Sequence, residues 1–403
     1  MATVVLIGTL DTKGHEYGYL RDRLREQGVD VLLVDAGVFE AQVEPDVSRQ
    51  EVAEAAGADA DALAAAGDRG AAVSAMAAGA AVVAKRLHDE GRLDGIAAVG
   101  GSGNSSIAAA AMRGLPVGVP KLIVSTVASG DTRPYMGASD VTMTYSVVDI
   151  AGINQISSRI LTNAAGAIAG MVKAQAPPVE SAKPLVTASM FGVTTPCVTR
   201  ARERLEELGY EVLVFHQTGT GGESMEELMR AGFIAGSLDA TTTELADELV
   251  GGVLPAYPGR LEAAGELGLP QVVSLGALDM VNFGPRESVP ERFEGRNLYV
   301  HNPTITLMRT TPEESRELGR RIGRKLSGAK GPTALFVPLR GVSMIATEGQ
   351  PFHDADADAA LLEGLRETLG ENVEVHELDT DVNSESFALA MADRLDEMIR
   401  EAR

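Results

Sequence analysis

Apolar runs that end in glycine- and hydroxyl-rich turns recur along this chain, and they restrict the folds that it can adopt. Ile96 to Val99 predicts a buried strand, which Gly100 to Gly103 cannot continue, and Ile107 to Met112 then predicts a helix. A second apolar run, Lys121 to Val124, leads into Ser125 and Thr126 in the same manner. Strand, turn and helix in succession predict an α/β fold built on mostly parallel sheets.

The first of these turns stands at a predicted helix N-terminus. Backbone N–H groups there lack intrahelical partners and the helix dipole is positive, so an anion is favoured. The turn matches neither the P-loop nor the dinucleotide fingerprint, and a turn that only reverses the chain is the alternative. The candidate nucleotide-binding residues are Gly100, Gly101, Ser102, Gly103, Asn104 and Ser105, with Ser125, Thr126 and Gly130 at the same sheet edge.

A similar turn follows the predicted first strand, Ala2 to Ile7. It contributes five further candidates, Gly8, Thr9, Asp11, Thr12 and Lys13. Lys13 is expected to bind a phosphate and Asp11 to act as a magnesium ligand or base. Asp35, at the end of the next strand, is expected to accept a ribose hydroxyl. A turn-forming aspartate and a solvated lysine are the structural alternatives.

Length favours two domains, because 403 residues exceed what one hydrophobic core usually covers. We expect a Rossmann-like nucleotide-binding domain over residues 1–175, a Pro-containing linker over 174–183, and a second Rossmann-like domain over 184–403. Both are expected to be three-layer domains with a cleft between them. The acidic, Ala-rich stretch 40–70 shows no recognisable chemistry.

Charge excludes some partners. The formal net charge of −22 is spread over many segments, and such a surface repels nucleic acid and anionic membranes. It is typical of a salt-adapted cytosol. Neither a leader nor a membrane-spanning apolar run is evident, and the one cysteine, Cys197, is more typical of core packing than of catalysis. We therefore expect a soluble cytoplasmic protein.

The predicted second domain has its own glycine turn, formed by Thr218, Gly219, Thr220, Gly221 and Gly222. We expect it to approach a ligand or bind an anion. Glu244 is expected to complete a capping box with Thr241. Candidate catalytic residues at strand ends are His216, Asp279 and His301, together with Asp131 of the first domain. A histidine satisfied at a domain interface is the alternative for His301.

Ten motifs together carry a family resemblance: GTLDTKGHE, GGSGNSS, PKLIVSTVASGD, SVVDIAGIN, MFGVTTPCV, HQTGTGG, LDATTTELAD, SLGALDMVNFG, HNPTITLMRTT and GVSMIATEG. From about residue 4 to 390 the chain resembles the tobamovirus-resistance-type ATP-binding domain family of microbes and plants. The resemblance implies two Rossmann-like subdomains, nucleotide binding and a homodimer. Plant members add a TIM-barrel-like segment, which this sequence is expected to lack. Asn104 stands where the family often has threonine.

These observations predict an ATP-binding protein that uses Mg²⁺, with Asp11 and Asp131 as metal ligands. An ATP-dependent enzyme acting on a small metabolite is the first hypothesis. A nucleotide-regulated binding protein without catalysis is the second. The third is a lyase or hydrolase whose pocket accepts a phosphorylated or carboxylate substrate.

Overall fold

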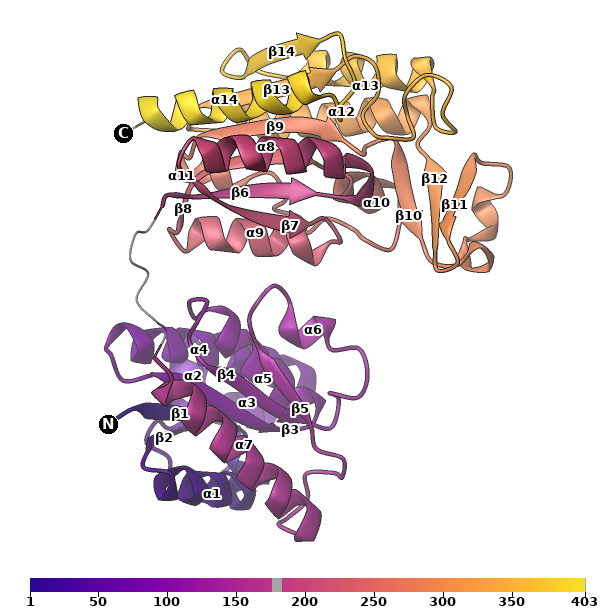
Figure 1. The fold of residues 1–403 in the computed structure, drawn as a ribbon. Helices are drawn as coiled ribbons and strands as arrows, with labels where there is room; N and C mark the ends of the chain where they lie inside the picture. The colour runs from indigo at the N-terminus through magenta and orange to yellow at the C-terminus, as the bar shows by residue number, and fades with distance from the viewer. Residues whose placement is uncertain (176–182, 403) are drawn as a thin grey trace. The chain divides into compact units, whose positions relative to one another are not determined.

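The computed structural model describes residues 1–175 and 183–402, which belong to two compact units, Met1–Pro178 and Val179–Arg403 (Figure 1). Most of the predicted linker 174–183 lies outside the described residues. Each unit contains its own parallel sheet flanked by helices, so the predicted α/β fold class is confirmed.

The first unit is built on a five-stranded parallel sheet of order β2-β1-β3-β4-β5. The strands are β1 (Thr3–Gly8), β2 (Asp30–Asp35), β3 (Gly95–Gly100), β4 (Lys121–Ser125) and β5 (Thr142–Tyr145). The helices are α1 (Leu10–Glu26), α2 (Arg49–Ala55), α3 (Ala60–Ala66), α4 (Arg69–Asp89), α5 (Ser102–Arg113), α6 (Arg133–Met136) and α7 (Gln155–Lys173). β1, β3 and β4 are apolar along most of their length because helices cover both faces of the sheet.

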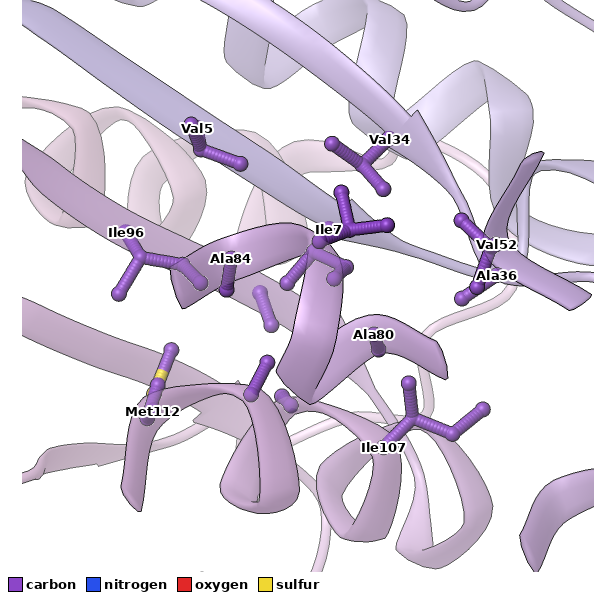
Figure 2. Close-up of a cluster of buried hydrophobic side chains, with 14 of the residues drawn as sticks. Val5, Ile7, Val34, Ala36, Val52, Ala80, Ala84, Ile96, Ile107 and Met112 are labelled. Carbon is purple, nitrogen blue, oxygen red and sulfur yellow. The ribbon is translucent and has the colours of Figure 1, made fainter. Parts of the chain in front are cut away.

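Helices on the two faces of this sheet form separate hydrophobic clusters. On one face, α1 and α7 pack through residues such as Leu20 and Leu161. On the other face, α2, α4 and α5 pack against β1 and β3; Figure 2 shows Ile7 and Ile96 with Ile107 in this cluster. Ala80 and Ala84 supply small side chains on α4, which allow that helix to approach its neighbours closely.

The second unit has a six-stranded parallel sheet of order β14-β13-β9-β8-β6-β7. Its strands are β6 (Leu185–Met190), β7 (Glu211–His216), β8 (Ile234–Thr241), β9 (Gln271–Gly276), β13 (Thr333–Pro338) and β14 (Glu374–Leu378). Its helices are α8 (Thr195–Glu207), α9 (Thr220–Arg230), α10 (Glu244–Val250), α11 (Ala263–Leu267), α12 (Pro312–Ser327), α13 (Ala355–Thr368) and α14 (Glu385–Glu401), with 3-10 turns at Gly192–Thr194, Arg286–Ser288 and Glu291–Phe293. The Thr311–Glu314 capping box at the start of α12 stabilises that helix N-terminus.

A separate antiparallel sheet of order β10-β12-β11 projects from this unit. It comprises β10 (Met280–Phe283), β11 (Leu298–Asn302) and β12 (Ile305–Arg309). His301 was expected at the end of a strand, and it lies within β11 of this antiparallel hairpin. Only two residues, Pro303 and Thr304, separate β11 from β12, and so short a connection pairs strands antiparallel.

Helix α4 meets the length and composition of a membrane span, and it is the one helix of the described residues that does so. Its buried side chains, among them Met76, Val83 and Leu87, belong to the core cluster of the first unit. The apolar composition of α4 is thus used in packing against α2 and α5.

Candidate functional site

The strand order of the first unit reverses between β1 and β3, so the connections that leave these strands run to opposite faces of the sheet. A crevice at the carboxyl ends of the strands is expected at this position. The structure has a cavity of about 610 Å³ there. Its lining includes Thr9, Asp11, Thr12, Lys13, Gly37, Val38, Phe39, Leu63, Arg69, Val73, Met76, Gly101, Ser102, Gly103, Asn104, Ile107, Thr126 and Asp149. The two predicted glycine turns therefore meet in one pocket.

The N-terminus of α5 is open to this pocket. Its N-cap, Gly101, supplies no side-chain hydrogen bond, and the carbonyl of Gly101 accepts a hydrogen bond from Ser105 N at 2.9 Å. Space beside the turn is also free: a Cβ on Gly103 would have its nearest neighbour, Arg69 Nη2, at 3.8 Å. Unpaired N–H groups beside free space favour an anionic ligand.

The glycines just before these turns have a different role. A Cβ on Gly8 would overlap the Tyr17 hydroxyl, and one on Gly100 would lie 2.7 Å from the Cβ of Asn104. Asn104 accepts a hydrogen bond from Thr9 N (3.1 Å) and donates to the Tyr17 hydroxyl (2.8 Å). Its side chain thus joins the two turns to each other, and Asn104 lines the pocket without a free amide.

Asp35 does not line the pocket. Its Oδ1 accepts hydrogen bonds from Leu10 N (3.1 Å) and Gly37 N (2.9 Å), and the residue is 1% exposed. Burial raises the pKa of its carboxyl, against the lowering effect of these two bonds. Oδ1 holds the start of α1, and Asp35 is not among the residues that line the pocket, so its contact with a ribose hydroxyl stays a prediction.

Asp11 and Lys13 line the pocket, as the sequence predicts. Asp11 Oδ2 accepts from Val38 N (3.2 Å) and Phe39 N (3.1 Å), while Oδ1 is buried without a hydrogen-bond partner in the described part of the chain. The ammonium of Lys13 donates to the carbonyl of Ile150, which holds it at the pocket wall. Asp11 thus keeps one carboxylate oxygen without a hydrogen-bond partner in the described part of the chain, and both residues border the pocket.

The remaining first-unit candidates separate into two groups. Thr126 lines the pocket, whereas the hydroxyls of Ser105 and Ser125 are buried and bonded to each other at 2.7 Å. Asp131 is an exposed residue outside the pocket lining, paired with Arg133 at 2.8 Å, and this pair lowers the pKa of its carboxyl to about 2. Gly130 lies in the turn beside it, where its N–H donates to Val127 O. The structure thus brings Asp11 to the pocket without Asp131.

Sequence reasoning missed one wall of the pocket. The segment 40–70, in which no chemistry was recognised, contributes Leu63 and Ala64 from α3 and Arg69 from the start of α4. Phe39, 59% exposed, and Asp149 also line the cavity. The one local signal was Asp68, which caps α4 by accepting a bond from Ala71 N and so places Arg69 at the helix start.

Two family models match nearly the whole chain. The N-terminal domain of the uncharacterised protein family UPF0261 matches residues 2–177, and the C-terminal domain of that family matches residues 183–399. The chain belongs to the UPF0261 family.

UPF0261 relatives occur in distant organisms. A UPF0261 protein of Clostridium tetani is 54% identical over 98% of both chains, and one of Mesorhizobium japonicum is 46% identical over 98% of this chain and 99% of its own. The ToMV resistance protein Tm-1 of Solanum lycopersicum is 44% identical over 78% of this chain and 43% of its own length. The predicted resemblance is therefore confirmed at the level of the family, and ATP stays a prediction.

Solved structures add little to the assignment of a UPF0261 ligand. The S. aureus MnaA–UDP co-structure aligns at 11% identity and a TM-score of 0.24, covering 92% of this chain and 93% of its own. Acinetobacter baumannii MurG aligns at 15% identity and a TM-score of 0.22, covering 100% and 95%. At such scores the likeness carries no argument about the site.

The glycine turn of the second UPF0261 unit is already occupied by a carboxylate of the chain itself. Glu244 Oε1 accepts hydrogen bonds from Gly219 N (2.6 Å) and Gly222 N (3.3 Å). Glu244 Oε2 accepts from the Nε of the buried Arg260 at 2.9 Å. The predicted capping box with Thr241 is wrong, because the glutamate side chain is directed to the turn. The N–H groups of the turn Thr218–Gly222 therefore bind the Glu244 carboxylate, in the position where an anionic ligand was expected.

The three second-unit catalytic candidates have unrelated surroundings. His216 is exposed and stacks on Phe191, with ring centroids 5.2 Å apart, and His301 lies in β11 with its ring 6.5 Å from that of Tyr299. Asp279 is 1% exposed and accepts from Ser343 Oγ at 2.8 Å; burial raises its pKa to about 6. No hydrogen bond or ring contact joins any two of these three side chains within the described residues. Cys197 is buried, and burial raises its pKa to about 12, as fits a core cysteine.

Proposed function

We propose that this UPF0261 chain binds a nucleoside phosphate, with ATP as the first candidate, in the pocket of its first unit. The observation that carries the proposal is the uncapped N-terminus of α5 beside Gly101 and Gly103, which lines the pocket together with Lys13. Four N–H groups at a helix start, with the dipole behind them, favour a phosphate group.

The rest of the cavity suits the other half of such a ligand. Its walls include the apolar side chains of Val73, Met76 and Ile107, and the exposed ring of Phe39 lies at the rim. Aromatic rings stack on nucleobases of every kind. A volume of about 610 Å³ falls in the range of small-molecule and cofactor sites.

The pocket lining contains two carboxylates near which Mg²⁺ could bind, those of Asp11 and Asp149. The unpartnered Oδ1 of Asp11 is a suitable hard oxygen ligand, and Asp149 supplies a second carboxylate to the lining. No group of three or more His, Cys, Asp or Glu side chains is placed to hold a metal ion within residues 1–175 and 183–402. Mg²⁺ commonly binds one or two carboxylates and completes its shell with substrate phosphates and water. When bound, it would neutralise phosphate charge.

Calorimetric titration of the full chain with ATP and Mg²⁺ tests the proposal. We expect saturable binding by the wild type and binding weakened at least about tenfold by Lys13→Ala, since the ammonium is a charged phosphate donor. Lys85→Ala is the matched control, because Lys85 is an exposed lysine of α4 paired with Asp89. A folded wild type that does not bind ATP would end the proposal.

Turnover is measured separately from binding. We propose that the bound ATP serves a reaction on a small metabolite, and release of inorganic phosphate in the presence of a metabolite mixture tests this. Tight binding with ATP left intact would instead assign a nucleotide-regulated binding protein. If the protein does not bind ATP but binds a phosphorylated or carboxylate metabolite, the result would favour the lyase or hydrolase hypothesis.

A further inference from the structure

Arg69 is an exposed arginine that lines the pocket of an acidic protein. The chain has 57 acidic against 35 basic residues, and Arg86 on the same helix reaches a carboxylate, that of Glu51, at 3.9 Å. Arg69 makes no hydrogen bond or ion pair within the described residues. Its guanidinium instead lies beside the glycine turn of α5, with Nη2 3.8 Å from the position of a Cβ on Gly103.

The backbone that carries Arg69 is well defined. Gly67 ends α3 with a φ of +67°, and Asp68 then caps α4 by accepting a hydrogen bond from Ala71 N at 3.0 Å. Arg69 is the first residue of α4, and Val73, one turn further along, also contacts the Gly103 region. The cap and the packing of α4 fix the backbone of Arg69 beside the pocket, and its exposed side chain lines that pocket.

Lys13 and Arg69 approach the pocket from opposite faces of the sheet. Lys13 belongs to α1, which packs with α7, whereas Arg69 belongs to α4, which packs with α2 and α5 on the other face. Both line the same cavity, with the open N-terminus of α5 contributing further N–H donors. Two cations from opposite walls are suited to two anionic groups, since a single phosphate is satisfied by one cation and a helix N-terminus.

We propose that Arg69 is a specificity residue that binds a second anionic group of the ligand, so that the pocket selects di- and triphosphates over monophosphates. This inference rests on the proposed nucleotide function and adds the ligand class to it. Arg69 acts here as a planar, permanently charged donor that can bind two phosphate oxygens at once.

Titration of the full chain with AMP, ADP and ATP, each with Mg²⁺, tests the inference. We expect Arg69→Gln to weaken ADP and ATP binding about tenfold and AMP binding less than about twofold, because the lost charge faces only the second anionic group. Arg69→Lys should restore part of the loss. Arg86→Gln removes the same charge from the same helix away from the pocket, and it should leave all three affinities unchanged. Equal effects of Arg69→Gln on all three nucleotides, or none on any, would overturn the inference.

Inorganic pyrophosphate and orthophosphate separate this inference from the proposed function. If the wild type binds ATP but Arg69→Gln changes the affinities for AMP, ADP and ATP by the same factor, only the proposed role of Arg69 is wrong. If nucleotides fail to bind while pyrophosphate binds in an Arg69-dependent manner, the nucleotide is wrong and the two-anion pocket stands. If neither class of probe binds the folded wild type, both ideas fail.

Discussion

Arg260 and Asp239 form a two-bond ion pair inside the second unit, with Nη1–Oδ2 at 2.5 Å and Nη2–Oδ1 at 2.7 Å. The arginine is fully buried, and Glu226 and Glu244 also pair with it. Burial alone would lower the pKa of Arg260, but the charges of Asp239, Glu244 and Glu226 hold that pKa well above its ordinary value. This cluster fixes Glu244 where it fills the glycine turn.

Arg260→Met should lower the free energy of unfolding by about 3–5 kcal/mol, because it leaves Asp239 and Glu244 buried without a cation, whereas Glu226 keeps Arg230 at 3.7 Å. Denaturant unfolding of the full chain measures the loss. Arg324→Met is the control, since Arg324 is 54% exposed and pairs with Glu317 on the surface; its change should stay below about 1 kcal/mol. Similar small losses in both variants would contradict the structural role of the cluster.

Gly103→Ala should weaken ATP binding while leaving the fold intact. The added methyl group has no protein atom closer than 3.8 Å and takes up space beside the α5 N-terminus. Stability should change by at most about 1 kcal/mol, the difference in helix propensity. Titration calorimetry and thermal unfolding of the same sample measure both quantities.

Gly8→Ala is the comparison variant for Gly103→Ala, because it should change stability where Gly103→Ala should change ATP affinity. Its methyl group would overlap the Tyr17 hydroxyl, which donates to Ile7 O at 2.6 Å, so we expect a stability loss of about 1–3 kcal/mol. An unchanged affinity in Gly103→Ala would contradict the role of the α5 N-terminus in binding, and an unchanged stability in Gly8→Ala would contradict the close packing of Gly8 against Tyr17.

Asp279→Asn should gain stability relative to wild type as the pH rises. Burial raises the folded-state pKa of Asp279 from 3.8 to about 6, so the folded protein keeps a proton that the unfolded chain releases in this window. Ionising Asp279 therefore costs stability as the pH rises through about 4 to 6, and asparagine removes that cost. The difference in unfolding free energy between variant and wild type should shift by roughly 1–2 kcal/mol in favour of the variant between pH 4.5 and 7.5.

Denaturant unfolding at both pH values provides the check. Arg309 keeps its own ion pair with Asp358 at 2.8 Å in the variant, so no guanidinium loses its partner. A difference that does not depend on pH would mean that Asp279 ionises near its ordinary pKa in the folded protein.

Asp11→Asn should remove most of the enhancement that Mg²⁺ gives to ATP binding, because the unpartnered Oδ1 is the carboxylate oxygen free to bind a cation. Asp131→Asn should have no effect, since its carboxylate is exposed and paired with Arg133. Titrations with and without Mg²⁺ compare the two variants. Loss of the enhancement in Asp131→Asn alone would contradict the role of Asp11 and identify Asp131 as the metal ligand.

The sequence predicted the parallel sheets and the two turns of the pocket because both depend on local patterns. Apolar runs such as Ile96 to Val99 end abruptly in glycine, and that signal needs no knowledge of distant residues. The occupant of the second glycine turn could not be found in this way. Glu244 lies 25 residues after Gly219, and only the tertiary fold brings the carboxylate to the turn. The place of Arg69 in the pocket lining was missed for the same reason, because only the tertiary fold brings Arg69 beside Gly103.

His301 shows a different limit. The apolar run Leu298 to Val300 resembles the strands of the main sheet, but its partner is the neighbouring run from Ile305, across Pro303 and Thr304. The short connection was visible in the sequence, and giving it more weight than the strand pattern would have predicted the hairpin.

Every residue that lines the pocket lies between Thr9 and Asp149, within the first unit. A pocket whose lining residues all belong to one folding unit can be transferred as a whole by gene fusion. The matched region amounts to only 43% of the length of the tomato relative, so related sequence is found there within a longer polypeptide. Selection on the rest of such a protein can therefore proceed without disturbing the residues that line this pocket.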